Sequence, residues 1–147
     1  MLLCFDPGKT TGVAQFNMYG ELEFIDHLDT EQQIYSWIYS REETKTTVLY
    51  EGFARGNTAS KDQLMTVELC GFIRGCAMTI DLKCVMQYPT IRLPYEKIAK
   101  AMVKAYRGEI KPQTPTHAIA AVAHGIAYME KEKIEWNKKY WMNLTYN

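Results

Sequence analysis

Two acidic residues each stand directly after an apolar run, where a buried strand is expected to end. Asp6 follows residues 2–5, and Glu51 follows residues 46–50. In a sheet with parallel central strands, the carboxyl ends of neighbouring strands meet at one edge, so the two carboxylates could lie side by side. Such a pair repels itself unless a proton or a cation lies between its members, and its oxygen ligands favour Mg²⁺ or Mn²⁺. Each acid taken alone could equally well end a strand or cap a turn.

A third feature is an alanine-rich segment, THAIAAVAHGIAY, at residues 116–128. Alanine favours a helix, and helical spacing places four of its residues on one face. These are His117, Ala120, Ala121 and His124. Two imidazoles therefore lie on either side of two methyl groups. A lone histidine is more often structural than a ligand, so this face does not define a site by itself.

The elements that must position these residues follow from the pattern of apolar residues and turns. Strands are predicted at 2–5, 11–17, 22–28, 46–50 and 83–88. Helices are predicted at 31–41, 61–80, 95–106 and 115–132, with Thr30 and Ser60 as N-caps of the first two. A hairpin followed by alternating helices and strands predicts an α/β fold, with a mixed sheet covered by helices. We expect one domain over residues 1–147, with the tail at about 134–147 unassigned.

The composition is that of an ordinary globular protein without a global charge signal. The 147 residues carry a formal net charge of +0, so any contact with DNA must use a local patch. The four cysteines have no CxxC spacing, and we expect reduced thiols rather than disulfides or a zinc site. No signal peptide and no long apolar run is visible, so we expect a soluble, cytoplasmic protein that does not enter a membrane.

The turn after Asp6, DPGKTTG, narrows the choice of function. Gly8 and Gly12 let the backbone come close to a bulky group. The GKT fragment is not a phosphate-binding P-loop, because no glycine stands five residues before Gly8 and a strand follows instead of a helix. An Asp-x-Gly turn between the first two strands is used by the actin-like ATPases and by the RuvC-type Holliday junction resolvases. An actin-like ATPase needs two subdomains, and this chain is too short for them.

The remaining motifs resemble those of the RuvC-type resolvases of the RNase H-like superfamily, especially the small phage proteins. FDPGKTTGVA resembles the first-strand signature of the family and VLYEGF the fourth-strand signature. ELCGFIRGCA resembles the small-residue helix after the second acid, and YPT the turn after the next strand. The resemblance covers most of the chain. It implies an RNase H-like fold, in which a mixed five-stranded sheet with antiparallel first three strands is flanked by helices.

The resemblance also implies a metal site. Asp6 and Glu51 match two metal-binding acids of the family, and His117 matches the first ligand position of its late helix. The family has an aspartate three residues later, followed by alanine, whereas this chain has Ala120 followed by Ala121. The chain is therefore interpreted as lacking one carboxylate. Because Asp6, Glu51 and His117 all remain, an engineered inactive variant is favoured over a natural relative that has lost its activity.

The implied reaction is hydrolysis of a phosphodiester at the crossover of a four-way DNA junction. Two Mg²⁺ or Mn²⁺ ions about 3.5–4 Å apart would activate a water and stabilise the leaving oxygen. His124 would support the ligands or pack beside them. The catalytic lysine of the family has no unambiguous match, and Lys100 and Lys111 are the candidates. Junction symmetry favours a homodimer, formed through the helix that carries Gly71 and Gly75, although these glycines could equally pack on their own sheet.

Basic and polar residues near this edge are the predicted DNA contacts. They are Arg55, Asn57, Ser60 and Lys61 after Glu51, and Arg92, Lys97, Lys104, Arg107 and Lys111 further along the chain. Any single lysine could equally lie on a solvated helix face. Three other functions stay open. They are an endonuclease for branched or flapped DNA in general, a non-catalytic junction-binding protein whose Ala120 is native, and a nucleotide-binding actin-like fragment.

Overall fold

The structure is a computed structural model and describes residues 1–42, 45–53, 60–107 and 116–146. Its centre is a five-stranded sheet made of β1 (Leu2–Asp6), β2 (Thr11–Phe16), β3 (Leu22–Leu28), β4 (Thr47–Glu51) and β5 (Lys83–Gln87). The strands lie in the order β3-β2-β1-β4-β5. Strand β2 is antiparallel to β1 and β3, whereas β4 is parallel to β1 and β5. The predicted mixed sheet with antiparallel first three strands is thereby confirmed.

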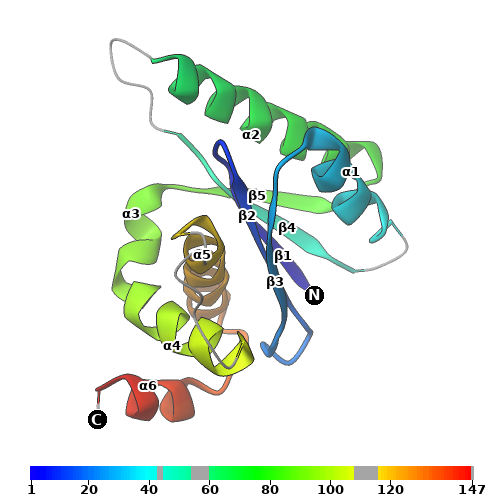
Figure 1. Ribbon diagram of the computed structural model, residues 1–147. Coiled ribbons are helices and arrows are strands. Elements are labelled where there is room, and N and C mark those ends of the chain that lie inside the picture. Colours follow the sequence, from blue (N-terminus) through cyan, green and yellow to red (C-terminus); the bar gives the residue numbers. More distant parts are fainter. Residues whose placement is uncertain (43–44, 54–59, 108–115, 147) are drawn as a thin grey trace.

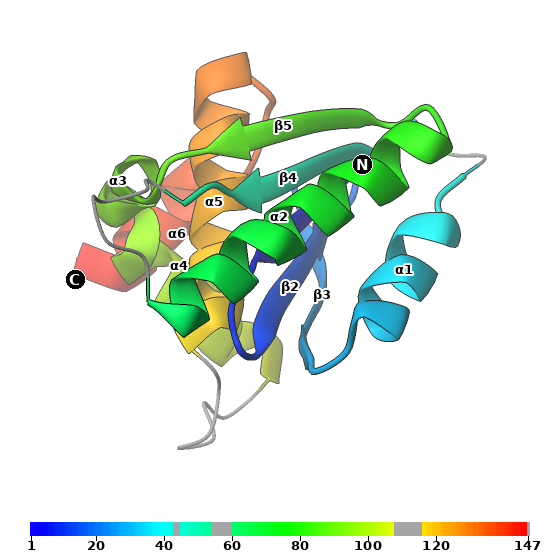
Figure 2. The same ribbon diagram turned by 90° about the horizontal axis from the view of Figure 1, so that it is seen from above.

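Helices cover both faces of this sheet (Figure 1). They are α1 (Glu31–Tyr39), α2 (Lys61–Thr79), α3 (Pro89–Arg92), α4 (Glu96–Arg107), α5 (Thr116–Glu132) and α6 (Lys138–Tyr146), with a 3₁₀ turn at Leu93–Tyr95. Helices α1 and α2 lie on one face, and α5 lies on the other with α4 and α6 (Figure 2). Thr30 and Ser60 form the predicted N-caps, each as a capping box with the glutamine three residues later.

Two short helices were not expected from the sequence. Helix α3 starts at Pro89, which ends β5 as predicted and also suits the first turn of a helix. Helix α6 lies in the tail that had no assignment. The indole nitrogen of Trp136 donates to Glu130 at 2.7 Å, and Lys138 pairs with the same carboxylate at 2.5 Å. These contacts, together with the burial of Trp136, join the tail to the end of α5.

Strand β1 is buried on both faces, so its alternate side chains enter two separate cores. Leu3 and Phe5 pack with Ile34 of α1 and Ile73 of α2, whereas Cys4 packs in the core beneath α5. Burial on both sides explains why this strand is apolar throughout. The four cysteines are free thiols, as expected. No helix in the described segments combines the length and the apolar character needed to cross a bilayer.

Helix α5 lies very close to the sheet, and small residues make this possible. Its residues from Ala118 to Met129 are all buried. A methyl group on Gly12 of β2 would overlap the backbone of His117 and Ala118, and one on Gly125 would overlap the ring of Phe16. The two glycines thus allow contact between helix and strands at the first turn and in the middle of α5. The first turn of the helix is thereby placed beside the end of β1.

Replacing Gly12 by alanine is expected to lower the free energy of unfolding by about 2–4 kcal/mol, because backbone atoms leave the added methyl group no room. The matched control is Gly71→Ala on the outer face of α2, where a methyl group would meet nothing within 4 Å. That change should be neutral or stabilise the helix by up to about 1 kcal/mol. Urea unfolding measures both. Equal stability of Gly12→Ala and the parent would contradict the close approach of α5.

Candidate active site

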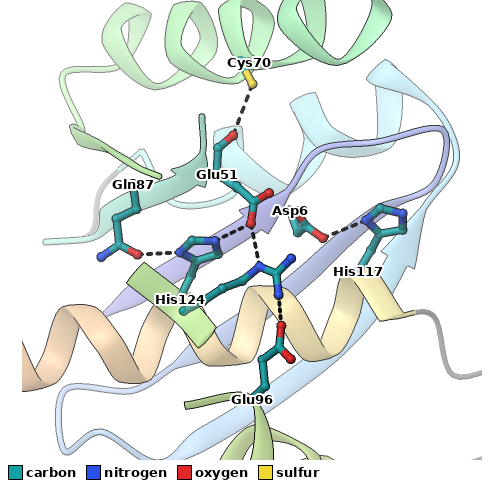
Figure 3. A network of polar contacts seen from close by, with 8 residues as sticks. Asp6, Glu51, Cys70, Gln87, Glu96, His117 and His124 are labelled. Carbon is teal, nitrogen blue, oxygen red and sulfur yellow. Dashed lines mark hydrogen bonds and ion pairs between the residues drawn. The ribbon is translucent and has the colours of Figure 1, made fainter. Parts of the chain in front are cut away.

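The ends of β1 and β4 bring the two predicted acids together. The strands are parallel neighbours with Phe5 opposite Tyr50, so Asp6 and Glu51 stand at the same edge of the sheet. Each acid is the last residue of its strand rather than the first one after it, and Asp6 is buried. The first turn of α5 adds His117 at this edge (Figure 3). The structure therefore brings together the three residues that the sequence placed in one site.

Asp6 and His117 form the first polar pair of the site. Oδ2 of Asp6 lies 2.7 Å from Nδ1 of His117. Burial raises the pKa of Asp6, and the hydrogen bond from His117 offsets only part of that effect. The same hydrogen bond raises the pKa of His117 above its ordinary value, although burial acts in the opposite direction. Gly8 makes room for the imidazole, because a methyl group there would lie 2.9 Å from its Cε1 atom.

Glu51 is held by two bases. Its Oε2 atom lies 2.6 Å from Nε2 of His124 (Figure 3). The same atom accepts a hydrogen bond of 2.7 Å from Nε of Arg92. Burial raises the pKa of Glu51, but the hydrogen bonds from these two side chains outweigh it and leave the pKa below its usual value. The carboxylate is therefore ionised at neutral pH. Nδ1 of the buried His124 lies 2.7 Å from the side-chain oxygen of Gln87.

Arg92 makes contacts at the site that the sequence did not predict. It is one of the predicted DNA contacts, and in the structure its guanidinium joins Glu51 to Glu96. Helix α3 carries the arginine to this position directly after β5, the strand next to β4. Its side chain is 21% exposed and that of Glu51 is 17% exposed, so the ion pair is partly shielded from water. Attraction between the charges is stronger here than it would be at the surface.

Position 120 contributes no ligand. Ala120 is buried and lies on the face of α5 between His117 and His124. Within the described segments, no three side chains of histidine, cysteine, aspartate or glutamate are placed to hold a metal ion. The site contains two carboxylates, and both are bonded to bases of the chain itself. As it stands, this donor set does not fit the pair of Mg²⁺ ions that the sequence resemblance implies.

The fold was compared with known proteins. Neither a protein-family model nor a curated protein sequence matches the chain. Among solved structures, Thermus thermophilus RuvC in complex with a Holliday junction substrate matches with a TM-score of 0.66 and 13% identity, over 90% of this chain and 94% of that one. This chain has the RNase H-like fold of RuvC.

Two further structures support the same fold. A second structure of T. thermophilus RuvC gives a TM-score of 0.57 and 16% identity, over 90% of this chain and 96% of the other. The complex of Fowlpox virus resolvase with Holliday junction DNA matches with a TM-score of 0.58 and 16% identity, over 89% of this chain and 99% of the other. The RuvC-like fold thus accounts for nearly the whole chain and nearly the whole of each similar protein.

The predicted DNA contacts are distributed unevenly over the RuvC-like fold. Arg55, Asn57 and Lys111 lie outside the described residues. Ser60 is used as the N-cap of α2, and Lys61 is exposed in the first turn of that helix. Exposed lysines on α4 are Lys97, Lys100 and Lys104, and Arg107 is the last residue of this helix.

The basic residue at the acids is Arg92 and not Lys100. In the described part of the chain, no hydrogen bond or ion pair connects Lys100 to Asp6 or Glu51, whereas Arg92 bonds Glu51 directly. One signal in the sequence could have indicated this. Arg92 follows the end of a predicted strand by four residues, and a glutamate stands four residues later at helical spacing. Gln87, the last residue of β5, follows the same strand-end rule that identified Asp6 and Glu51.

The Asp6–His117 pair predicts a pH-dependent contribution to stability. The raised pKa of His117 means that its charge stabilises the fold fully below about pH 6.5, and that this contribution is lost as the pH rises through the folded-state pKa. The contribution also falls at acidic pH, once Asp6 takes up a proton at its raised pKa. His117→Gln should therefore lower the free energy of unfolding most at pH values between these two pKa values.

The expected loss in that window is about 0.5–1 kcal/mol, because the histidine side chain is 40% exposed and solvent screens the pair. Urea unfolding of the parent and of His117→Gln at several pH values measures this difference. His27→Gln is the matched control, since His27 is also partly exposed and stands beside an aspartate, but lies in β3 and pairs with Asp26 instead of an acid of the site. A difference that does not change between pH 5 and pH 9 would contradict the ion pair.

Proposed function

We propose that this chain recognises branched DNA, above all four-way junctions, and has the site of a junction-resolving endonuclease in which one carboxylate is replaced by a methyl group. The observation that carries the proposal is the convergence of Asp6, Glu51 and His117 at one edge of a RuvC-like sheet. Two of the similar structures are complexes with Holliday junction DNA. Asp6, Glu51 and His117 are the residues through which the chemistry would act, with position 120 as the missing member.

The outer face of α2 supports a homodimer as the form that binds a junction. Gly71 and Gly75 do not pack on their own sheet, because a methyl group on either would meet nothing within 4 Å. Leu64, Val67 and Met78 of the same helix are exposed. A smooth, partly apolar helix face suits close contact with a second copy, and two copies would match the twofold character of a four-way junction. Sedimentation of the free chain tests this directly.

Junction binding is the primary test of the proposal. In fluorescence anisotropy, we expect tighter binding of a labelled four-way junction than of a duplex with the same arms. The double variant Lys100→Gln/Lys104→Gln on α4 should bind more weakly, and the slope of log affinity against log salt should fall by about 2. Lys45→Gln/Lys131→Gln removes the same charge from two other exposed sites, before β4 and near the end of α5, and should change neither. Equal affinity for junction and duplex would overturn the proposal.

Restoring the carboxylate tests the catalytic half of the proposal. Ala120→Asp should confer Mg²⁺-dependent nicking of a labelled four-way junction, because it adds a negative charge and an oxygen ligand to the site. We expect no nicking by the parent. Ala120→Asn has the same shape without the charge and should not cleave. Circular dichroism checks that both variants fold. If Ala120→Asp folds, binds the junction and still cleaves no more than Ala120→Asn, the chain is a junction-binding protein without latent activity.

Substrate range separates four-way junctions from branched DNA in general. The Ala120→Asp variant would be given junctions, three-way branches and flaps of the same sequence. Preferential cleavage of the four-way junction supports a resolvase. Equal cleavage of all branches supports the broader endonuclease.

A further inference from the structure

We propose that Arg92 is a built-in counter-cation of this site, so that the acidic pair binds no divalent ion in the absence of DNA. The guanidinium supplies the positive charge that Asp6 and Glu51 would otherwise take from a metal. This inference concerns the site of the proposed function, but its main test uses no DNA and does not depend on junction binding.

The charge balance of the site is the first argument. Asp6 and Glu51 supply two negative charges at one edge of the sheet. Arg92 keeps its charge at every accessible pH, bonds Glu51 at 2.7 Å, and is close enough to Asp6 for the two charges to interact. A divalent ion between the acids would therefore meet one compensated carboxylate and a nearby like charge. Both effects oppose binding in a place that is largely shielded from water.

The use of the ligand atoms is the second argument. Oε2 of Glu51 already accepts from Arg92 and faces Nε2 of His124, so its two lone pairs are both directed at bases of the chain. Oδ2 of Asp6 and Nδ1 of His117 are bonded to each other at 2.7 Å. A metal ligand must direct a lone pair at the ion. An ion that binds through Oε2 of Glu51, Oδ2 of Asp6 or Nδ1 of His117 would first have to displace one of these partners.

The anchoring of Arg92 is the third argument. Its guanidinium also pairs with Glu96, four residues later, at the start of α4. Helix α3 packs against α5, which fixes the backbone from which the arginine extends. The arginine is thus held between two carboxylates instead of lying free at the surface. Ala120 also opposes metal binding, because an aspartate at this buried position would supply a negative charge that attracts a metal ion.

The decisive experiment is a titration of the DNA-free chain with Mn²⁺. Calorimetry and the electron paramagnetic resonance signal of free Mn²⁺ measure the binding. The parent should show no saturable binding at millimolar metal. Arg92→Gln should bind Mn²⁺ at least tenfold more tightly than the parent, which corresponds to about 1.4 kcal/mol. Arg92→Lys keeps the charge and should behave like the parent. These variants separate the effect of charge from the effect of side-chain volume.

The matched control is Lys138→Gln. It also removes the cation of a glutamate ion pair, with Glu130 at 2.5 Å, but in the tail helix, and should leave Mn²⁺ binding at the level of the parent. Circular dichroism establishes that each variant is folded. Saturable binding of Mn²⁺ by the parent overturns the proposal, and so does a folded Arg92→Gln variant that gains no affinity for the metal.

A second measurement keeps the proposal testable if Arg92→Gln does not fold. Junction affinity of the parent should be the same in Mg²⁺ and in EDTA at matched ionic strength, because the arginine already provides the charge. A junction affinity that requires Mg²⁺ overturns the inference. If the chain binds no junction in either buffer, the proposed function fails while the Mn²⁺ titration still decides the role of Arg92.

Discussion

The contact between the first turn of α5 and the start of β2 is the constraint on which the site depends. Only a residue without a side chain fits at Gly12, because the backbone of His117 lies directly against it. That contact fixes where the helix begins relative to the end of β1. Since Asp6 ends β1 and His117 stands in the first turn of α5, their hydrogen bond follows from the approach of the backbones. The hydrogen bond between Asp6 and His117 therefore depends on the absence of a side chain at Gly12.

The second half of the site has a different origin. Glu51 stands at the end of β4 between β1 and β5, and its partners come from α5 and α3. Asp6 and Glu51 would repel each other if both were left without partners in a buried place. The bases around them remove most of that repulsion. The contrast in pKa follows, since burial raises the pKa of Asp6 by more than its single base lowers it, whereas the two bases beside Glu51 outweigh the effect of burial and lower its pKa.

Much of this arrangement could be predicted from the sequence, for identifiable reasons. The rule that acids after apolar runs meet at the carboxyl edge of parallel strands correctly placed Asp6 beside Glu51. Helical spacing correctly put His117 and His124 on one face. The partner of His124 could not be found from spacing within the helix, because Glu51 lies on a distant strand. The contact of Arg92 with Glu51 could not be predicted, because the direction of the four-residue helix α3 depends on packing against α5, which no periodicity in the sequence records.

The pairing of Glu51 with Arg92 and His124 has a consequence for how the chain withstands change. Sites that keep several acids close together for catalysis store electrostatic strain, and proteins commonly gain stability when such a site loses its function. Here Asp6 and Glu51 each have a base of the same chain beside them. The contacts of these two acids thereby hold α3 and α5 to the edge of the sheet. Metal binding through the bonded oxygen atoms would have to break some of these contacts, so the hydrogen bonds that oppose an ion are the same ones that hold the two helices to the sheet.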